Sequence, residues 1–169
     1  MKRLFTLMLL VAACGFTYGQ VSVTGTAPSK KFQLQKKVDK EVMPSFDLEA
    51  RKAEDDALYM KGYGGFRFAY PHDVQITPKN AGTWENLPDG GRVWRVRITS
   101  FDAHTINLVF KRFYLPEGGE MYLYNEDRSY EIGAFTPANH KADGVFATAP
   151  LPGKTDNVES YEPAAMLNA

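Results

Sequence analysis

The strongest constraint on the fold is a two-residue alternation of apolar and polar side chains, which begins near Phe66 and continues almost to the end of the chain. In the run "VWRVRITS", Trp94, Val96 and Ile98 fall on one face of a strand and the arginines on the other. Similar runs follow, separated by turns rich in Gly, Pro and Asn: "HTINLVFKRF", "EMYLYN", "YEIGAF", "GVFATA" and "NVESYE". The pattern predicts an all-β domain over residues 65–163, an antiparallel, jelly-roll-like β-sandwich of about seven or eight strands.

Two near-identical pentapeptides, "LPDGG" at 87–91 and "LPEGG" at 115–119, raise the question of a phosphate-binding loop. In such a loop a helix follows the glycines, so that its N–H groups and its dipole face the anion. Both copies lead instead into an alternating run. We therefore interpret them as turns in which Pro ends one segment and a glycine pair supplies positive φ angles. The two pairs are Gly90 with Gly91 and Gly118 with Gly119.

The first 19 residues have the pattern of a secretory signal peptide. Lys2 and Arg3 precede the apolar run "LFTLMLLVAAC", and Gly19 before Gln20 predicts cleavage between these two residues. The apolar run is too short to span a bilayer, so we expect an exported protein, periplasmic or extracellular, without a transmembrane segment. Cys14 is the only cysteine and has two interpretations. It is either discarded with the signal, which leaves a mature chain without disulfides, or it is the lipidated cysteine of a lipoprotein, because "VAAC" fits the lipobox pattern.

Three shorter segments complete the organisation of the chain. Residues 20–44 are polar and basic without a sustained period, which predicts a flexible arm and the place most open to proteolytic nicking. Residues 45–61 predict one short helix with Ser45 as its N-cap and Gly62 just past its end. Residues 164–169 form a C-terminal tail.

Charge and motif content exclude several classes of function. The chain carries 20 basic and 20 acidic residues, so it lacks the basic excess on which nucleic-acid binding depends. The only imidazoles are His72, His104 and His140, and they accompany no GxSxG, HExxH or Cys/His cluster. The acidic loops "NEDRS" and "KADG" lack the spacing of a calcium loop and are better explained as turns. We therefore predict no catalytic, cofactor-binding or metal-binding residue.

Aromatic side chains are the remaining signal of a binding site. Tyr122 and Tyr124 alternate with Met121 and Leu123 in one run, so one of the two pairs must point away from the core. An outward-facing tyrosine pair together with Trp84 would form a flat face on which sugars stack. This keeps open a carbohydrate-binding or surface-binding face made by Trp84, Tyr122 and Tyr124.

The order of these runs resembles a known family. The series "GTWENLPDGG", "VWRVRI", "INLVF", "LPEGGEMYLYN", "IGAFT", "GVFAT" and "YEP" is similar to the N-terminal pro-region of secreted lysyl endopeptidase-like, trypsin-fold serine proteases of Bacteroidetes-type bacteria. The resemblance covers residues 43 to 163. It implies a domain that precedes a serine protease domain, is removed on maturation, and assists folding of the protease or blocks its cleft.

The chain departs from this family at its C-terminal end, where it reads "AAMLNA" and the family continues into the protease. The catalytic His, Asp and Ser of the family have no matching positions, so we expect no enzymatic activity from this chain alone. Two origins fit the departure: a truncated protease precursor, or a pro-region-like domain used by itself. The alternative function is a stand-alone carbohydrate- or surface-binding module.

Overall fold

The computed structural model describes residues 22–63 and 67–167, and these residues form a mostly β structure with few helices. The predicted signal peptide, Cys14 and the Gly19/Gln20 junction lie outside the described residues. The strands are β1 (Lys40–Val42), β2 (Thr83–Asn86), β3 (Arg92–Thr99), β4 (Thr105–Ile106), β5 (Val109–Phe110), β6 (Glu120–Asn125), β7 (Glu131–Phe135), β8 (Phe146–Ala147), β9 (Leu151–Pro152) and β10 (Thr155–Glu162). The helices are α2 (Pro28–Lys31), α3 (Leu48–Met60), α4 (Ala164–Leu167) and a 3-10 turn at Pro137–Asn139.

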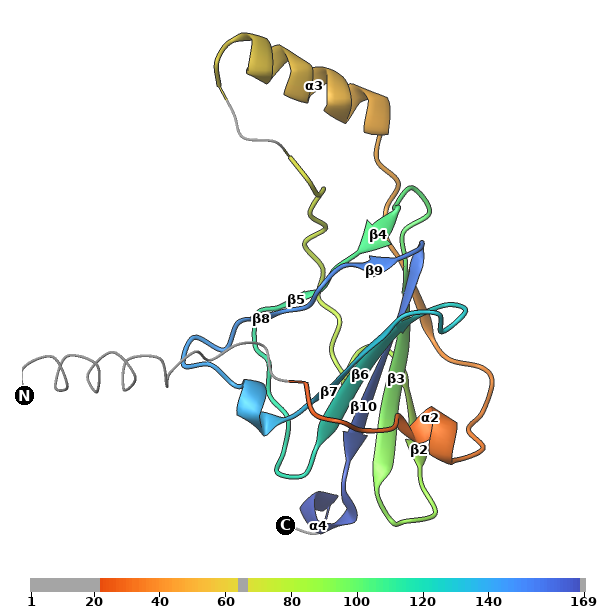
Figure 1. The fold of residues 1–169 in the computed structure, drawn as a ribbon. Helices are drawn as coiled ribbons and strands as arrows, with labels where there is room; N and C mark the ends of the chain where they lie inside the picture. Colours follow the sequence, from red (N-terminus) through yellow and green to blue (C-terminus); the bar gives the residue numbers. More distant parts are fainter. Residues whose placement is uncertain (1–21, 64–66, 168–169) are drawn as a thin grey trace, which may run out of the picture.

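Six of the strands form the main sheet, in the order β1-β3-β10-β6-β7 with β2 also paired to β3 (Figure 1). Strand β3 shares one edge between two partners, because β2 pairs antiparallel with residues 92–95 and β1 pairs parallel with residues 97–99. The other pairings in this sheet are antiparallel. The all-β prediction is thus confirmed in its coarse form.

One face of the sheet carries the hydrophobic core, and the ladders β4–β9 and β5–β8 lie over it. Side chains of β3, β6 and β10 pack with Phe146 of β8 and with Phe113 and Leu115, which lie between β5 and β6. The predicted alternation is confirmed, since Trp94, Val96 and Ile98 all belong to the core. The run 104–113 keeps its alternation but forms two separate strands, because between them Leu108 exchanges hydrogen bonds with Thr148.

Both pentapeptides are turns that lead into strands, as predicted, and the first glycine of each pair has a positive φ (83° at Gly90, 70° at Gly118). The second glycine of each pair has no positive φ, and it is required by space instead. A Cβ on Gly91 would lie 2.8 Å from the Glu162 carbonyl, and one on Gly119 would lie 2.8 Å from the Pro116 carbonyl.

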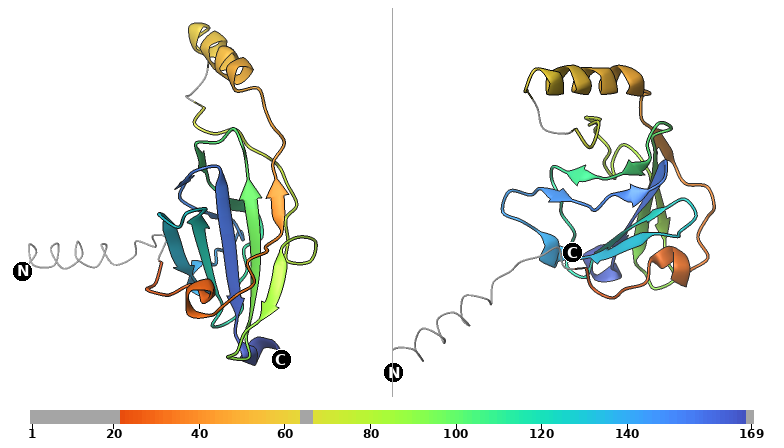
Figure 2. Two further views of the ribbon diagram at one scale, coloured as in Figure 1. Left: turned by 90° about the vertical axis from the view of Figure 1, so that its right-hand side faces the viewer. Right: turned by 45° about the horizontal axis from the view of Figure 1, so that its top comes forward.

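The sequence predicts a flexible arm at residues 20–44. In the structure, residues 22–43 instead lie against the main sheet (Figures 1 and 2). Val23 and Ala134 exchange two main-chain hydrogen bonds of 3.0 and 3.1 Å at the edge of β7, and β1 extends the sheet beside β3. The segment lacks a periodic pattern because single polar contacts hold it in place, and these leave no repeat in the sequence.

The predicted short helix is confirmed as α3, but its N-cap is Asp47 instead of Ser45. The Asp47 carboxylate accepts a 2.9 Å hydrogen bond from the Ala50 N–H, which satisfies one of the free donors of the first turn. No residue of α3 is buried. The helix projects well beyond the sheet at the end of a long excursion of the chain (Figures 1 and 2).

Candidate functional site

The predicted aromatic binding face does not exist, because the N-terminal segment covers it. Tyr122 and Tyr124 point away from the core, as the alternation allows, yet they are only 1% and 6% exposed. Ala27 is fully buried and packs with Tyr122, and a side chain at Gly25 would overlap the Tyr122 hydroxyl. Tyr122 donates a 2.6 Å hydrogen bond to Glu120, and burial is the main cause that raises its pKa.

Trp84 lies apart from this tyrosine pair and is half-buried. Its indole N–H donates to the Pro78 carbonyl at 3.0 Å, and the Arg92 guanidinium lies 4.1 Å from the ring centroid. One edge and one face of the ring therefore already have partners within the domain. The carbohydrate-binding interpretation based on an exposed row of Trp84, Tyr122 and Tyr124 is wrong.

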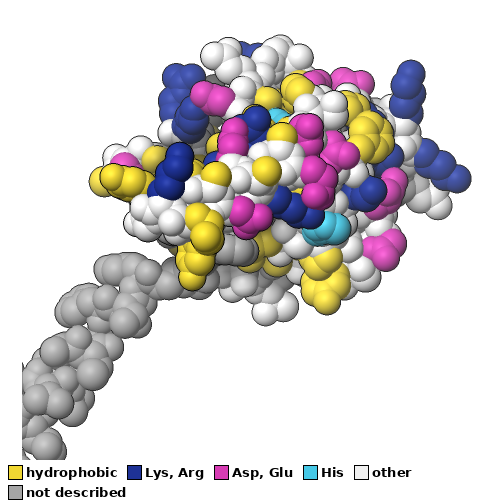
Figure 3. All heavy atoms as spheres, turned by 90° about the horizontal axis from the view of Figure 1, so that it is seen from above, with side chains coloured by type: hydrophobic (Ala, Val, Ile, Leu, Met, Phe, Trp, Pro, Cys, Tyr) yellow, Lys and Arg dark blue, Asp and Glu magenta, His cyan; other side chains and the backbone are white. Residues whose placement is uncertain are grey.

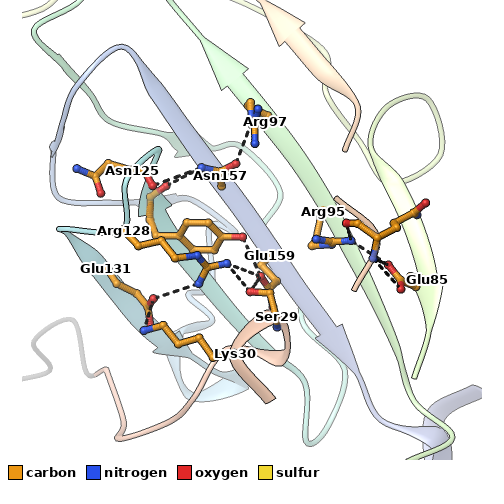
Figure 4. A network of polar contacts seen from close by, with 12 residues as sticks. Ser29, Lys30, Glu85, Arg95, Arg97, Asn125, Arg128, Glu131, Asn157 and Glu159 are labelled. Atoms are coloured by element: carbon orange, nitrogen blue, oxygen red, sulfur yellow. Dashed lines mark hydrogen bonds and ion pairs between the residues drawn. The ribbon is translucent and has the colours of Figure 1, made fainter. Parts of the chain in front are cut away.

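The buried carboxylate of Glu159 binds residues 22–43, which we call the covering segment, to the sheet (Figure 4). The side chain is 0% exposed and accepts three hydrogen bonds: 2.7 Å from the Ser29 N–H, 2.5 Å from the Ser29 hydroxyl and 2.9 Å from the Tyr124 hydroxyl. The guanidinium of Arg128 lies 3.9 Å from the same carboxylate and 3.7 Å from the Tyr124 ring centroid. A buried charge needs hydrogen-bond or ion-pair partners. Because Ser29 supplies two of them, this network holds the covering segment against the sheet. Burial, followed by the nearby Glu159 charge, raises the pKa of Tyr124 to about 12.

A second polar cluster holds the next part of the segment against β2 and β3 (Figure 4). Arg95 is buried and donates to the Glu85 carboxylate at 2.8 Å and to the Gln35 carbonyl at 3.0 Å. The Gln35 N–H in turn donates to Glu85 at 3.1 Å, and the Asp39 N–H donates to the Thr83 hydroxyl at 3.0 Å. Residues 35–39 are therefore bound at both ends.

His140 and His72 occupy different environments within the domain. His140 accepts a 2.9 Å hydrogen bond from the Leu115 N–H and stacks on Tyr114. His72 packs edge-on against the stacked rings of Phe46 and Tyr70. Within residues 22–63 and 67–167, no three His, Cys, Asp or Glu side chains come together in a group that could hold a metal ion.

The two acidic loops are turns, as predicted. Asp127 accepts from both the N–H and the hydroxyl of Ser129, at 3.0 and 2.7 Å, and the hydroxyl bond is the main cause that lowers the pKa of Asp127. Asp143 accepts from the Val145 N–H at 3.0 Å. Each carboxylate thus accepts a hydrogen bond from the main-chain N–H two residues later, as in an Asx-turn.

Sequence reasoning missed Asp156, a fully buried carboxyl group on the core side of the sheet. It pairs with Ile98 on β3 and with Asn125 on β6, and therefore shares a face with Val158. Neither of its oxygens has a hydrogen-bond partner among the described residues, and burial raises the pKa of Asp156 to about 7. Extending the alternation of "NVESYE" back by one residue would have placed this Asp on the apolar face.

Four strongly exposed apolar side chains lie at or just after the C-terminal end of α3 in the sequence. Tyr59 and Met60 are 79% and 83% exposed, and Tyr63 and Phe68 are similarly open. Seen from above, acidic, basic and apolar side chains are interspersed on this face of the molecule (Figure 3). At the base of the excursion lies a recess of about 290 Å³, lined by residues 44–45 and 70–74. We call residues 44–76 the projecting segment.

No protein-family model matches the chain, and no solved structure gives a significant match. Among the helices of the described residues, none combines the length and the apolar character needed to cross a membrane.

Proposed function

We propose that this chain is a non-catalytic accessory domain of a secreted lysyl endopeptidase-like serine protease, which it binds in order to assist folding or to block the cleft. In this proposal the main sheet and the two ladders correspond to the jelly-roll-like sandwich of the pro-region. The support from the sequence is the ordered series of turns and strands between residues 43 and 163. The bond-breaking residues belong to the partner, a trypsin-fold protease domain.

The observation that carries the proposal is the projecting segment. A helix of 13 residues without a buried side chain gains nothing from tertiary packing, and isolated helices of this length are marginal in water. The body already has a continuous core to which α3 contributes no residue. Several large apolar side chains, left exposed at and just after the end of one helix, favour a protein-binding surface. Burial of Met60 or Phe68 against a partner would contribute about 1.5–3 kcal/mol each.

The effect of this binding on protease folding follows from mass action. A domain that binds the folded protease, and not its unfolded chain, shifts the folding equilibrium of the protease towards the native state. If the projecting segment lies across the cleft of the protease, the same contacts exclude substrate. Folding assistance and inhibition are therefore two consequences of one interface.

The test adds the purified domain to the mature cognate protease and measures hydrolysis of a lysyl substrate and the refolding yield of the denatured protease. A Tyr59→Ser/Met60→Ser double variant should weaken both effects by about tenfold or more, as expected for the loss of interface anchors. Tyr130→Ser is the matched control, because Tyr130 is an exposed tyrosine on the β6–β7 loop. If the wild-type domain changes neither quantity over a wide concentration range, the proposal fails.

A further inference from the structure

We infer that the Lys61–Gly62 peptide bond is the site at which a lysine-specific endopeptidase nicks this domain, and that the two resulting pieces remain assembled. The inference depends on the geometry of this chain alone and does not require the proposed protease partner. It replaces the sequence-based expectation that nicking falls in residues 20–44.

The bond lies at an open point among the described residues of the projecting segment. Lys61 directly follows α3 and is exposed. Gly62 has a φ of 70°, and no atom lies within 4 Å of the position that a Cβ would occupy there. From Pro44 to Asn80, the backbone–backbone hydrogen bonds of the described residues are confined to α3, its last turn and a turn at Thr77. No ladder of the sheet holds the described residues of this stretch.

An endopeptidase binds its substrate in an extended form, so the helix end must first open. Opening costs little free energy where few tertiary contacts are lost, and α3 buries no side chain. The three main-chain bonds at the helix end, from Lys61, Gly62 and Tyr63 to carbonyls in the last turn, are those lost first on fraying. The rate of cleavage then follows the population of this open form.

Other lysines are held more firmly. Lys36 and Lys37 lie between Gln35 and Asp39, which are both bound to the sheet through β2. Lys52 lies inside α3 and pairs with Glu49 at 2.9 Å. Cleavage at these positions requires either release of the covering segment or opening of the middle of the helix, so Lys61 should react before them.

The reaction is a simple hydrolysis. Water adds to the Lys61 carbonyl carbon, the C–N bond to Gly62 breaks, and the products are a carboxylate on Lys61 and an amino group on Gly62. No oxidant or second substrate is needed.

The piece that ends at Lys61 should stay bound, because three separate contacts hold it. Strand β1 pairs with β3 over three residue positions, Val23 and Ala134 exchange two main-chain hydrogen bonds, and Ser29 donates twice to the buried Glu159. Ala27, which belongs to this piece, is fully buried against Tyr122 and Ala134 of the sheet. These contacts lie outside the projecting segment and are untouched by the cut.

The experiment is a limited digestion of the purified chain with a lysine-specific endopeptidase, followed by intact-mass analysis and size-exclusion chromatography. The first product pair should come from cleavage after Lys61, co-elute under native conditions and separate in urea. Lys61→Gln should slow the first cut by about tenfold or more, since cleavage must then await a rarer opening. A Lys36→Gln/Lys37→Gln control should leave the rate unchanged.

Two results would overturn the inference: a first cut at any bond other than Lys61–Gly62, or pieces that separate without denaturant. The endopeptidase in this experiment need not be the proposed partner. Failure here therefore leaves the proposed inhibition or folding assistance to be judged by its own assay.

Discussion

Replacing the buried Asp156 with Asn should stabilise the domain, by an amount that grows with pH. In the folded protein both oxygens of Asp156 lack hydrogen-bond partners among the described residues, and burial raises its pKa from 3.8 to about 7. The folded state therefore holds a proton that the unfolded state releases between these two pH values. Stability contributed by the protonated carboxyl is fully present below pH 3.8 and is lost as the pH rises through about 7.

The gap between 3.8 and about 7 corresponds to about 4 kcal/mol at 1.36 kcal/mol per pH unit, which sets the upper limit of the effect. This is a large share of the 5–15 kcal/mol over which domains are typically stable, as an order-of-magnitude range. Asn has nearly the same shape and no charge to desolvate. Asp156→Asn should therefore match the wild type near pH 4 and exceed it by up to about 4 kcal/mol at pH 8.

The measurement is equilibrium urea unfolding of both proteins at several pH values from 4 to 8, with the slopes compared to verify that the folded states are alike. Asp127→Asn is the matched control, because Asp127 is exposed and its pKa is lowered in the folded protein. This control should lose stability above the normal pKa of Asp, a change of opposite sign. Parallel pH profiles for Asp156→Asn and the wild type would refute the reasoning.

Two further predictions concern the covering segment and the projecting segment. Ser29→Ala should destabilise the domain by about 1–3 kcal/mol in urea unfolding, because it removes the hydroxyl donor from the buried Glu159, while Ser129→Ala on a surface turn should have a smaller effect. Leu123→Ala should cost about 2–5 kcal/mol, because the side chain lies fully within the core, whereas Met60→Ala on the exposed helix should change stability by less than about 0.5 kcal/mol. Equal costs for the last two variants would mean that α3 packs against the body in solution.

Part of this fold can be predicted from the sequence because the relevant forces are local and periodic. The alternation in β3 identifies Trp94, Val96 and Ile98 as core residues, since successive side chains of a strand point to opposite faces. The same holds for the turns, in which Gly90 and Gly118 supply the positive φ angles.

The remaining features depend on pairings that no local pattern contains. Alternation places Tyr122 and Tyr124 on the face opposite Met121 and Leu123, but it cannot show which face is the core or that residues 25–29 cover the tyrosines. That cover depends on Ser29 meeting Glu159, a pairing of two unremarkable polar residues across 130 positions. Asp156 was missed for a different reason: the alternation of β10 includes it, but the predicted run began one residue later, at Asn157.

The hydrogen bonds between Ser29 and Glu159 also have a consequence for the order of folding steps. Ser29 is synthesised early, yet its partner belongs to the last strand of the sheet, so the covering segment must wait for nearly the whole domain. Contacts of such long sequence separation form slowly, because closing a large loop costs conformational entropy before the contact can contribute any stabilising free energy. Until β10 is in place, the tyrosines of β6 face water. The N-terminal segment is therefore expected to dock late in folding, as the step that closes the outer face of the sheet.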